Sequence, residues 1–153
     1  MIEIILTVDK EKVYREVAKT TEYIGSKSQT DETDYDLVST TDEDKEMLER
    51  FWNESKDLIS DSLKKVLLEA KEMVATSTTF NLKLGLSGSF DSNLKDSMQS
   101  SLFSFFVTNI VSKWSTFTNK QESTDYAAEA AGYIEDIRKK AFFKKKPVRP
   151  TYI

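Results

Sequence analysis

The chain contains no cysteine, no histidine and only two prolines. Without cysteine, disulfides, thiolate chemistry and cysteine-bound metals are excluded, which suits a cytosolic or particle-bound protein. Without histidine, the usual general base, the usual zinc ligand and the Ser-His and Cys-His catalytic pairs are excluded together. Catalysis would have to rest on carboxylates, lysine or tyrosine, so the composition favours a protein that is not an enzyme.

Long hydrophobic runs are also missing. No segment approaches the roughly 18 uncharged residues that a membrane span requires, and the acidic Glu3 contradicts a secretory signal at the start. The 153 residues are 39% hydrophobic and 31% charged, which is enough for one globular core. We therefore expect a soluble, single helical domain with a small β element over residues 1–143, followed by an extended basic arm over residues 144–153.

The net charge of -4 is modest, but the charges are segregated. Eight acidic residues and a single lysine lie between Asp31 and Glu46, whereas seven basic residues and no acidic one lie between Arg138 and Arg149. Pro147 and Pro150 forbid a helix in the last segment and favour an extended conformation. The sequence therefore predicts a basic arm at one end and an acidic surface elsewhere.

The longest periodic stretch begins at Thr40, which can cap a helix together with Glu43 three residues later. Apolar residues then recur at helical spacing at Leu48, Phe51, Trp52, Ile59, Leu63, Val66, Leu67, Ala70, Met73 and Val74. The pattern predicts one helix from Glu43 to Val74, about 48 Å long at 1.5 Å per residue. Such a helix would exceed the width of the domain and contact other chains.

Two segments alternate apolar and polar residues in the manner of strands. These are residues 2–8 and residues 79–87. Two strands can pair with each other inside the domain, but they leave two open edges, and an edge as apolar as Phe80, Leu82 and Leu84 usually needs cover. We expect these three residues to bind another subunit.

Three further helices are expected. Asp9 caps the first, which ends at Gly25 before a loop over residues 26–39; the second covers residues 91–117; the third starts at Ser123 or Thr124 and ends near Ala141. The second is apolar nearly all round between Leu102 and Val111, so it is expected to be the core helix, packed on two sides. The fold class is therefore α+β, mostly helical, with four helices, two short strands and an extended C-terminal arm.

Two segments resemble known site motifs, but each lacks residues that the motif requires. The acidic run from Asp34 lacks the glycine and the final glutamate of a calcium loop, and the Gly85–Ser89 segment has no histidine to activate Ser87. The carboxylates Glu129, Glu135 and Asp136 are typical of an exposed helix face. No catalytic residue, metal ligand or cofactor is predicted.

The basic C-terminus is the predicted partner-binding region. Its candidate residues are Phe142, Phe143, Lys144, Lys145, Lys146, Arg149 and Tyr152. A basic, proline-containing arm can dock on an acidic neighbouring subunit, which we favour. The same residues could instead follow a phosphate backbone with aromatics for stacking, or form a solvated tail.

A family resemblance rests on the first third of the chain. Residues 12–25 (KVYREVAKTTEYIG), 40–44 (TTDED) and 48–52 (LERFW) resemble small proteins encoded among the virion genes of tailed bacteriophages, crAss-like phages included. The layout of helices, a β element and an extended arm is similar to that of head-to-tail connector and tail-completion proteins.

This resemblance implies a structural subunit of a neck or tail ring, located in the virion. Its partners would be copies of itself and virion proteins such as portal or tail components, with DNA in proximity and no membrane. The resemblance transfers no catalytic role to any residue. The alternative is a nucleic-acid-binding protein that uses the basic arm.

Overall fold

The computed structural model describes residues 1–28, with the backbone alone for residues 23–28, and residues 44–144. The described elements are, in chain order, β1 (Ile2–Asp9), α1 (Lys10–Ser28), α3 (Lys45–Ser62), β2 (Leu67–Val74), β3 (Thr78–Leu86), the 3-10 helix η2 (Ser92–Leu94), α4 (Lys95–Ser115) and α5 (Lys120–Ala141). The predicted class, α+β and mostly helical, is confirmed. The sheet, however, has three strands rather than two.

Helix α1 starts as the sequence predicts. The Asp9 carboxylate accepts hydrogen bonds from the backbone N–H groups of Glu11 at 2.9 Å and Lys12 at 3.3 Å, which satisfies donors that have no partner inside the helix. The predicted end at Gly25 is wrong, because the helix continues to Ser28. The rest of the predicted loop over residues 26–39 lies outside the described residues.

The predicted long helix over residues 43–74 is wrong after Ser62. Helix α3 ends at Ser62, and the carbonyl of Leu63 accepts hydrogen bonds from the N–H groups of Val66 and Leu67, both at 2.9 Å. This turn reverses the chain, which then runs as strand β2. Residues 67–74 form a strand rather than a helix because the second edge of β3 offers them main-chain hydrogen bonds. The predicted cap Thr40 lies outside the described residues.

The sheet has the order β1-β3-β2, and both pairings are antiparallel. Strand β3 is therefore central, and Phe80, Leu82 and Leu84 on it are buried in the chain's own core. Their prediction as partner-binding residues is wrong. The alternation in the sequence correctly indicated a strand with one buried face, but the cover comes from β1, β2 and the helices of the same chain.

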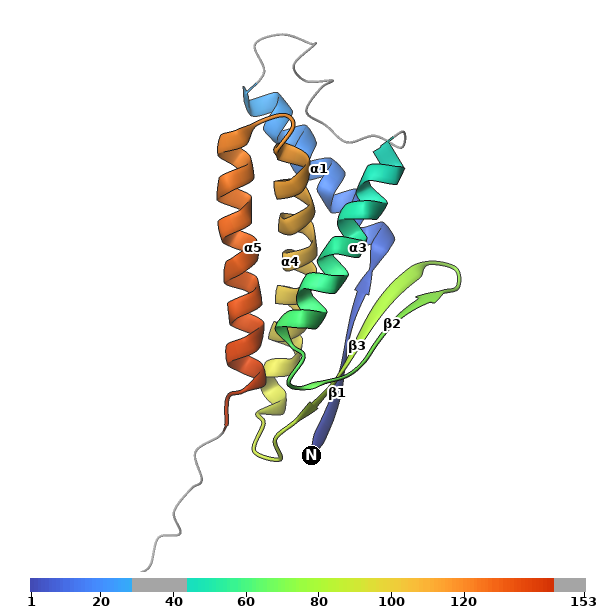
Figure 1. The fold of residues 1–153 in the computed structure, drawn as a ribbon, viewed down its shortest axis with the longest axis vertical. Coiled ribbons are helices and arrows are strands. Elements are labelled where there is room, and N and C mark those ends of the chain that lie inside the picture. Colours follow the sequence, from blue (N-terminus) through green and yellow to red (C-terminus); the bar gives the residue numbers. More distant parts are fainter. Residues whose placement is uncertain (29–43, 145–153) are drawn as a thin grey trace, which may run out of the picture.

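Helix α4 is the core helix, as predicted. It packs against α1, α3, α5 and β1, and Figure 1 shows it between α5 and α3. Inside the core, the amide of Asn109 donates a hydrogen bond to the hydroxyl of Ser55 at 2.7 Å, which fixes α4 against α3. Helix α5 starts earlier than predicted, because Asn119 rather than Ser123 or Thr124 caps it.

One hydrophobic core runs through the described residues. The even-numbered side chains of β1 and β3 enter it, together with Trp52 and Phe106, whose ring centroids lie 4.7 Å apart. The helices cover one face of the sheet, and the β2–β3 hairpin projects beyond them on one side (Figure 1). The other face carries the odd-numbered side chains.

Candidate assembly surface

The free edge of β1 is covered at Thr7 by a side chain. The backbone N–H of Thr7 donates a hydrogen bond to Oε1 of Gln99 on α4 at 2.8 Å, and Nε2 of Gln99 donates to the carbonyl oxygen of Thr7. Backbone groups of successive residues point to opposite sides of an antiparallel strand. The backbone N–H and C=O of Thr7 therefore point toward α4, and the backbone groups of the even-numbered residues of β1 point toward β3. Gln99 takes the place that a further strand would occupy.

Strand β2, at the other edge of the sheet, is open. By the same alternation, Glu69, Lys71 and Met73 direct their backbone groups to β3, opposite Lys83, Asn81 and Thr79.

The backbone N–H and C=O groups of Ala70, Glu72 and Val74 then point to the outer edge. In the described part of the chain no strand pairs with this edge, and every residue of β2 after Leu67 is exposed. Unpaired strand edges of this kind are templates for another strand.

A carboxylate holds β2 on the helices. The indole N–H of Trp52 on α3 donates to Oε1 of Glu72 at 2.7 Å, and Nζ of Lys56 lies 3.2 Å from the same oxygen. Burial would raise the pKa of Glu72, but these hydrogen bonds and the lysine charges outweigh it and hold the pKa below its usual value. Trp52 is fully buried, so its single N–H depends on Glu72.

A second polar cluster lies beside Trp52. The hydroxyl of Tyr14 donates to Oε2 of Glu49 at 3.0 Å, Lys10 forms an ion pair with the same carboxylate, and Nζ of Lys10 lies 5.9 Å from the centroid of the Trp52 ring. Burial, followed by the hydrogen bond and charge of Glu49, raises the pKa of Tyr14 well above its usual value. The protonated phenol keeps its hydrogen bond to Glu49, which ties α1 to α3 beside Trp52.

The register of β2 against β3 shifts between Leu67 and Glu69, as at a β-bulge. Opposite it, a Cβ added at Gly85 would lie 2.7 Å from Sδ of Met1 and 3.1 Å from Cδ1 of Leu68. The missing side chain therefore lets Met1 and Leu68 approach the backbone. The extra residue lies in β2, a strand that the sequence did not reveal.

Apolar side chains remain exposed on the outer sheet face and along β2. The exposed fractions are 51% for Ile5, 47% for Leu68, 48% for Met73 and 78% for Val74. Among them lie charges, including Lys83, whose Nζ is 3.3 Å from a carboxylate oxygen of Glu3. Exposed apolar side chains rimmed by charged ones are typical of surfaces that bind other proteins.

The predicted partner-binding residues at the C-terminal end fall into two groups. Phe142 and Phe143 follow α5 and are 45% and 50% exposed, while Lys144 forms an isolated antiparallel bridge with Phe90 before η2. This end of α5 lies at the same end of the molecule as the N-terminus (Figure 1). The remaining predicted residues lie outside the described residues and stay a prediction: Lys145, Lys146, Arg149 and Tyr152.

Asp136 fixes the end of α5 against α4. Its carboxylate accepts a hydrogen bond from the hydroxyl of Ser101 at 2.6 Å and another from Nζ of Lys140 at 2.7 Å. Burial would raise the pKa of Asp136, but these two donors lower it. A small cavity of about 260 Å³ beside them is lined by Leu94, Asp136, Lys139, Lys140 and Phe143. Asp136, the acidic residue that lines this cavity, is thus already paired.

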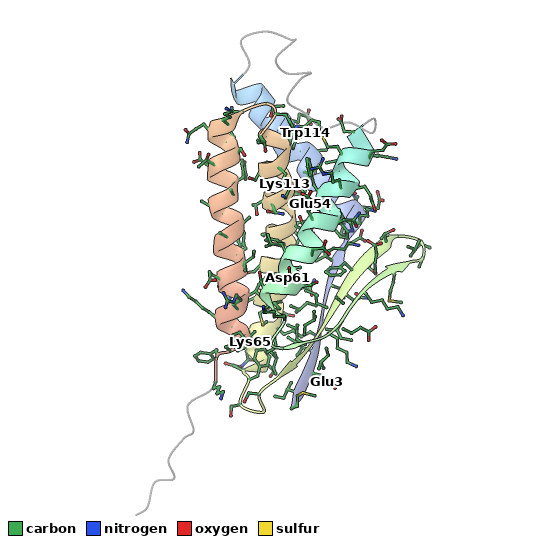
Figure 2. All side chains as sticks on the ribbon, viewed as in Figure 1. Glu3, Glu54, Asp61, Lys65, Lys113 and Trp114 are labelled. Atoms are coloured by element: carbon green, nitrogen blue, oxygen red, sulfur yellow. The ribbon has the colours of Figure 1, made fainter. Side chains whose placement is uncertain are left out.

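The charges between α3 and α4 are also paired. Figure 2 shows Glu54, Lys113 and Trp114 toward the end of the helices opposite Glu3. Nζ of Lys113 lies 2.9 Å from a carboxylate oxygen of Glu54, and this hydrogen bond is the main cause that lowers the pKa of Glu54. The pair ties α4 to α3 and offers no free acid or base.

Residues 1–28 and 44–144 contain no group of three acidic side chains able to hold a metal ion. Within the same ranges, no helix combines the length and hydropathy needed to cross a membrane. No protein family matches this chain, and neither a curated protein nor a solved structure is detectably similar to it. Its function must therefore be inferred from its own surfaces.

Proposed function

We propose that this protein is a structural subunit of a phage virion neck or tail ring, which acts by assembling with copies of itself and with other virion proteins. The observation that carries the proposal is the open edge of β2, bordered by the exposed side chains of Leu68, Met73 and Val74. The likeness of residues 12–25, 40–44 and 48–52 to phage virion proteins supports the virion as the place of assembly.

An open strand edge favours assembly for a physical reason. A second strand gains main-chain hydrogen bonds along the edge, while alternate side chains supply specificity. The opposite edge, at Thr7, is already occupied by Gln99. The chain therefore presents the outer edge of β2 for another protein, whereas the opposite edge is covered at Thr7.

The C-terminal end supplies a second surface. Phe142 and Phe143 are exposed beside the basic end of α5, and an acidic partner such as a portal or tail component would suit it. The charge segregation of the chain makes residues 31–46 of a neighbouring copy another suitable partner.

The test is native mass together with particle assembly. The full chain is produced alone and with the products of its genomic neighbours, and native mass spectrometry records the complexes. A variant that ends at Phe143 removes the basic arm. A multimer or stable complex, and particles that fail to assemble with the shortened chain, are expected. A monomer in all mixtures, with assembly unchanged by the deletion, would refute the proposal.

Nucleic-acid binding is the second candidate, favoured by the exposed Arg138 and Lys139 beside Phe142 and Phe143. Contacts to several phosphates make affinity fall steeply with salt. Binding to a fluorescent duplex is measured at 50 and 200 mM salt, with Glu129→Lys on the exposed face of α5 as a charge control. A large loss of affinity between 50 and 200 mM salt would favour this candidate over assembly. The variant in which both Arg138 and Lys139 are neutralised should no longer show this salt dependence.

A further inference from the structure

Two unpaired charges of opposite sign lie on the open strand. Glu69 and Lys71 are exposed on the outer face of β2, two residues apart. Neither forms an ion pair within the part of the chain that the structure describes. We propose that two copies of this chain pair through β2, antiparallel about a two-fold axis at Ala70, to form one continuous six-stranded sheet.

The number of open edges determines the symmetry. A head-to-tail arrangement would pair the β2 edge of one copy with the β1 edge of the next, where Gln99 already occupies the outward backbone N–H and C=O of Thr7 and leaves only those of Glu3 and Ile5 to bond a full-length strand. Pairing of β2 with β2 needs one open edge from each chain and is self-complementary. The assembly therefore closes at two copies and leaves no open β2 edge.

Backbone hydrogen bonding restricts the register. Since Ala70, Glu72 and Val74 direct their backbone groups outward, opposing residues in the dimer must both belong to this even-numbered set or both to the odd-numbered set. The two-fold axis then passes through a residue and not between two residues.

Charge favours one register among those centred on the middle of β2, at residues 69–72. An axis at Ala70 places Glu69 of each copy opposite Lys71 of the other, which gives two ion pairs on one face. An axis at Glu69, Lys71 or Glu72 places that residue opposite its own copy, with like charges in contact. Opposite charges across strands stabilise and like charges destabilise a pair. Ala70 also has the smallest side chain in β2, so the two backbones can approach closely.

The same register covers apolar surface. It brings Met73 of one copy beside the bulge at Leu68 of the other, at both ends of the paired segment. Both side chains are about half exposed in the single chain. Their burial supplies a hydrophobic contribution that main-chain pairing alone lacks.

This inference does not rest on the proposed function. The dimer uses the same open edge of β2 that carries the proposed function. A two-fold contact cannot build a ring by itself, so a ring of such dimers would use other surfaces, such as the C-terminal end of α5. Failure of the dimer would leave the virion proposal standing, and failure of particle assembly would leave the dimer standing.

The decisive experiment exchanges the charges. Glu69→Lys places two lysines per chain against two lysines, and Lys71→Glu places two glutamates against two glutamates. Each variant should raise the dimer dissociation constant about tenfold or more. An equimolar mixture of the two variants should form a heterodimer, and the double variant should dimerise like the wild type. Sedimentation equilibrium of the full chain measures all four, with Glu129→Lys on α5 as control.

A second variant tests the hydrogen bonds. Ala70→Pro removes an outward-facing N–H and leaves the bonds of β2 to β3 intact, a position where edge strands tolerate proline. Circular dichroism checks that it folds, and loss of the dimer is expected. The inference is overturned if the wild-type chain stays at its 17.6 kDa monomer mass at all concentrations. It is equally overturned if the two charge variants dimerise alone as well as the wild type does.

Discussion

Glu72 links the open strand to the core, and replacing it with alanine tests that link. The substitution leaves the indole N–H of Trp52, which is 0% exposed, without its acceptor. A buried donor left unsatisfied costs about 1–3 kcal/mol. Loss of the partly exposed pair with Lys56 adds less than about 1 kcal/mol. We expect Glu72→Ala to lower the free energy of unfolding by about 2–3 kcal/mol, a large share of the ~5–15 kcal/mol typical of a domain.

The assay is urea unfolding followed by far-UV circular dichroism, with hydrogen exchange of the β2 amides as a local readout. Glu72→Gln keeps an acceptor for Trp52 and should cost about 1 kcal/mol. Glu129→Ala, an exposed carboxylate on α5, is the control and should change stability by less than about 0.5 kcal/mol. If Glu72→Ala unfolds at the same urea concentration as Glu129→Ala, the carboxylate does not hold β2.

Three further predictions follow from polar groups inside the fold. Asn109→Ala should cost about 1–3 kcal/mol in urea unfolding, and a double variant with Ser55→Ala should cost less than the sum of the two single changes; strict additivity would argue against a shared bond. Gln99→Ala should destabilise by about 1–2 kcal/mol by leaving the backbone of Thr7 unpaired, and should speed aggregation measured by light scattering; unchanged aggregation would show that β1 needs no cover. Stability should be complete above the ordinary carboxyl pKa and should be lost as the pH falls below about 4.5, since three carboxyl groups have lowered pKa values in the fold: Glu54, Glu72 and Asp136. Thermal unfolding at pH 7 and pH 3 measures this loss, and equal midpoints would contradict it.

The helical class could be predicted because its signals are local. Asp9 caps α1, and the apolar residues of α4 surround the helix, so each pattern can be read within one segment. The strands β1 and β3 were also predictable, because their alternation of apolar and polar residues has a period of two.

Strand β2 could not be found in the same way. Its residues Leu67–Val74 include leucine, glutamate, alanine and lysine, all strong helix formers, and they continue the helical spacing of α3. No glycine or proline marks the turn after Leu63. The strand forms because β3 offers a free edge and Glu72 bonds to Trp52, which are tertiary effects that override propensity.

The same omission explains the errors about the site. With two strands, the apolar side chains of Phe80, Leu82 and Leu84 require cover from a partner subunit; with three, those residues are core and the free edge moves to β2. The closure of β1 by Gln99 depends on two residues 92 positions apart, so no local pattern indicates it. The exposed aromatics after α5 were foreseen, since their place at the end of the last helix follows from the sequence.

The most direct test of assembly is the native mass of the full chain over a range of concentrations, alone and with the products of its genomic neighbours. We expect integer multiples of the 17.6 kDa chain mass, with at least two copies at high concentration. A mass of one chain under every condition, combined with salt-sensitive binding to nucleic acid, would contradict the account and make the basic end of α5 the functional site.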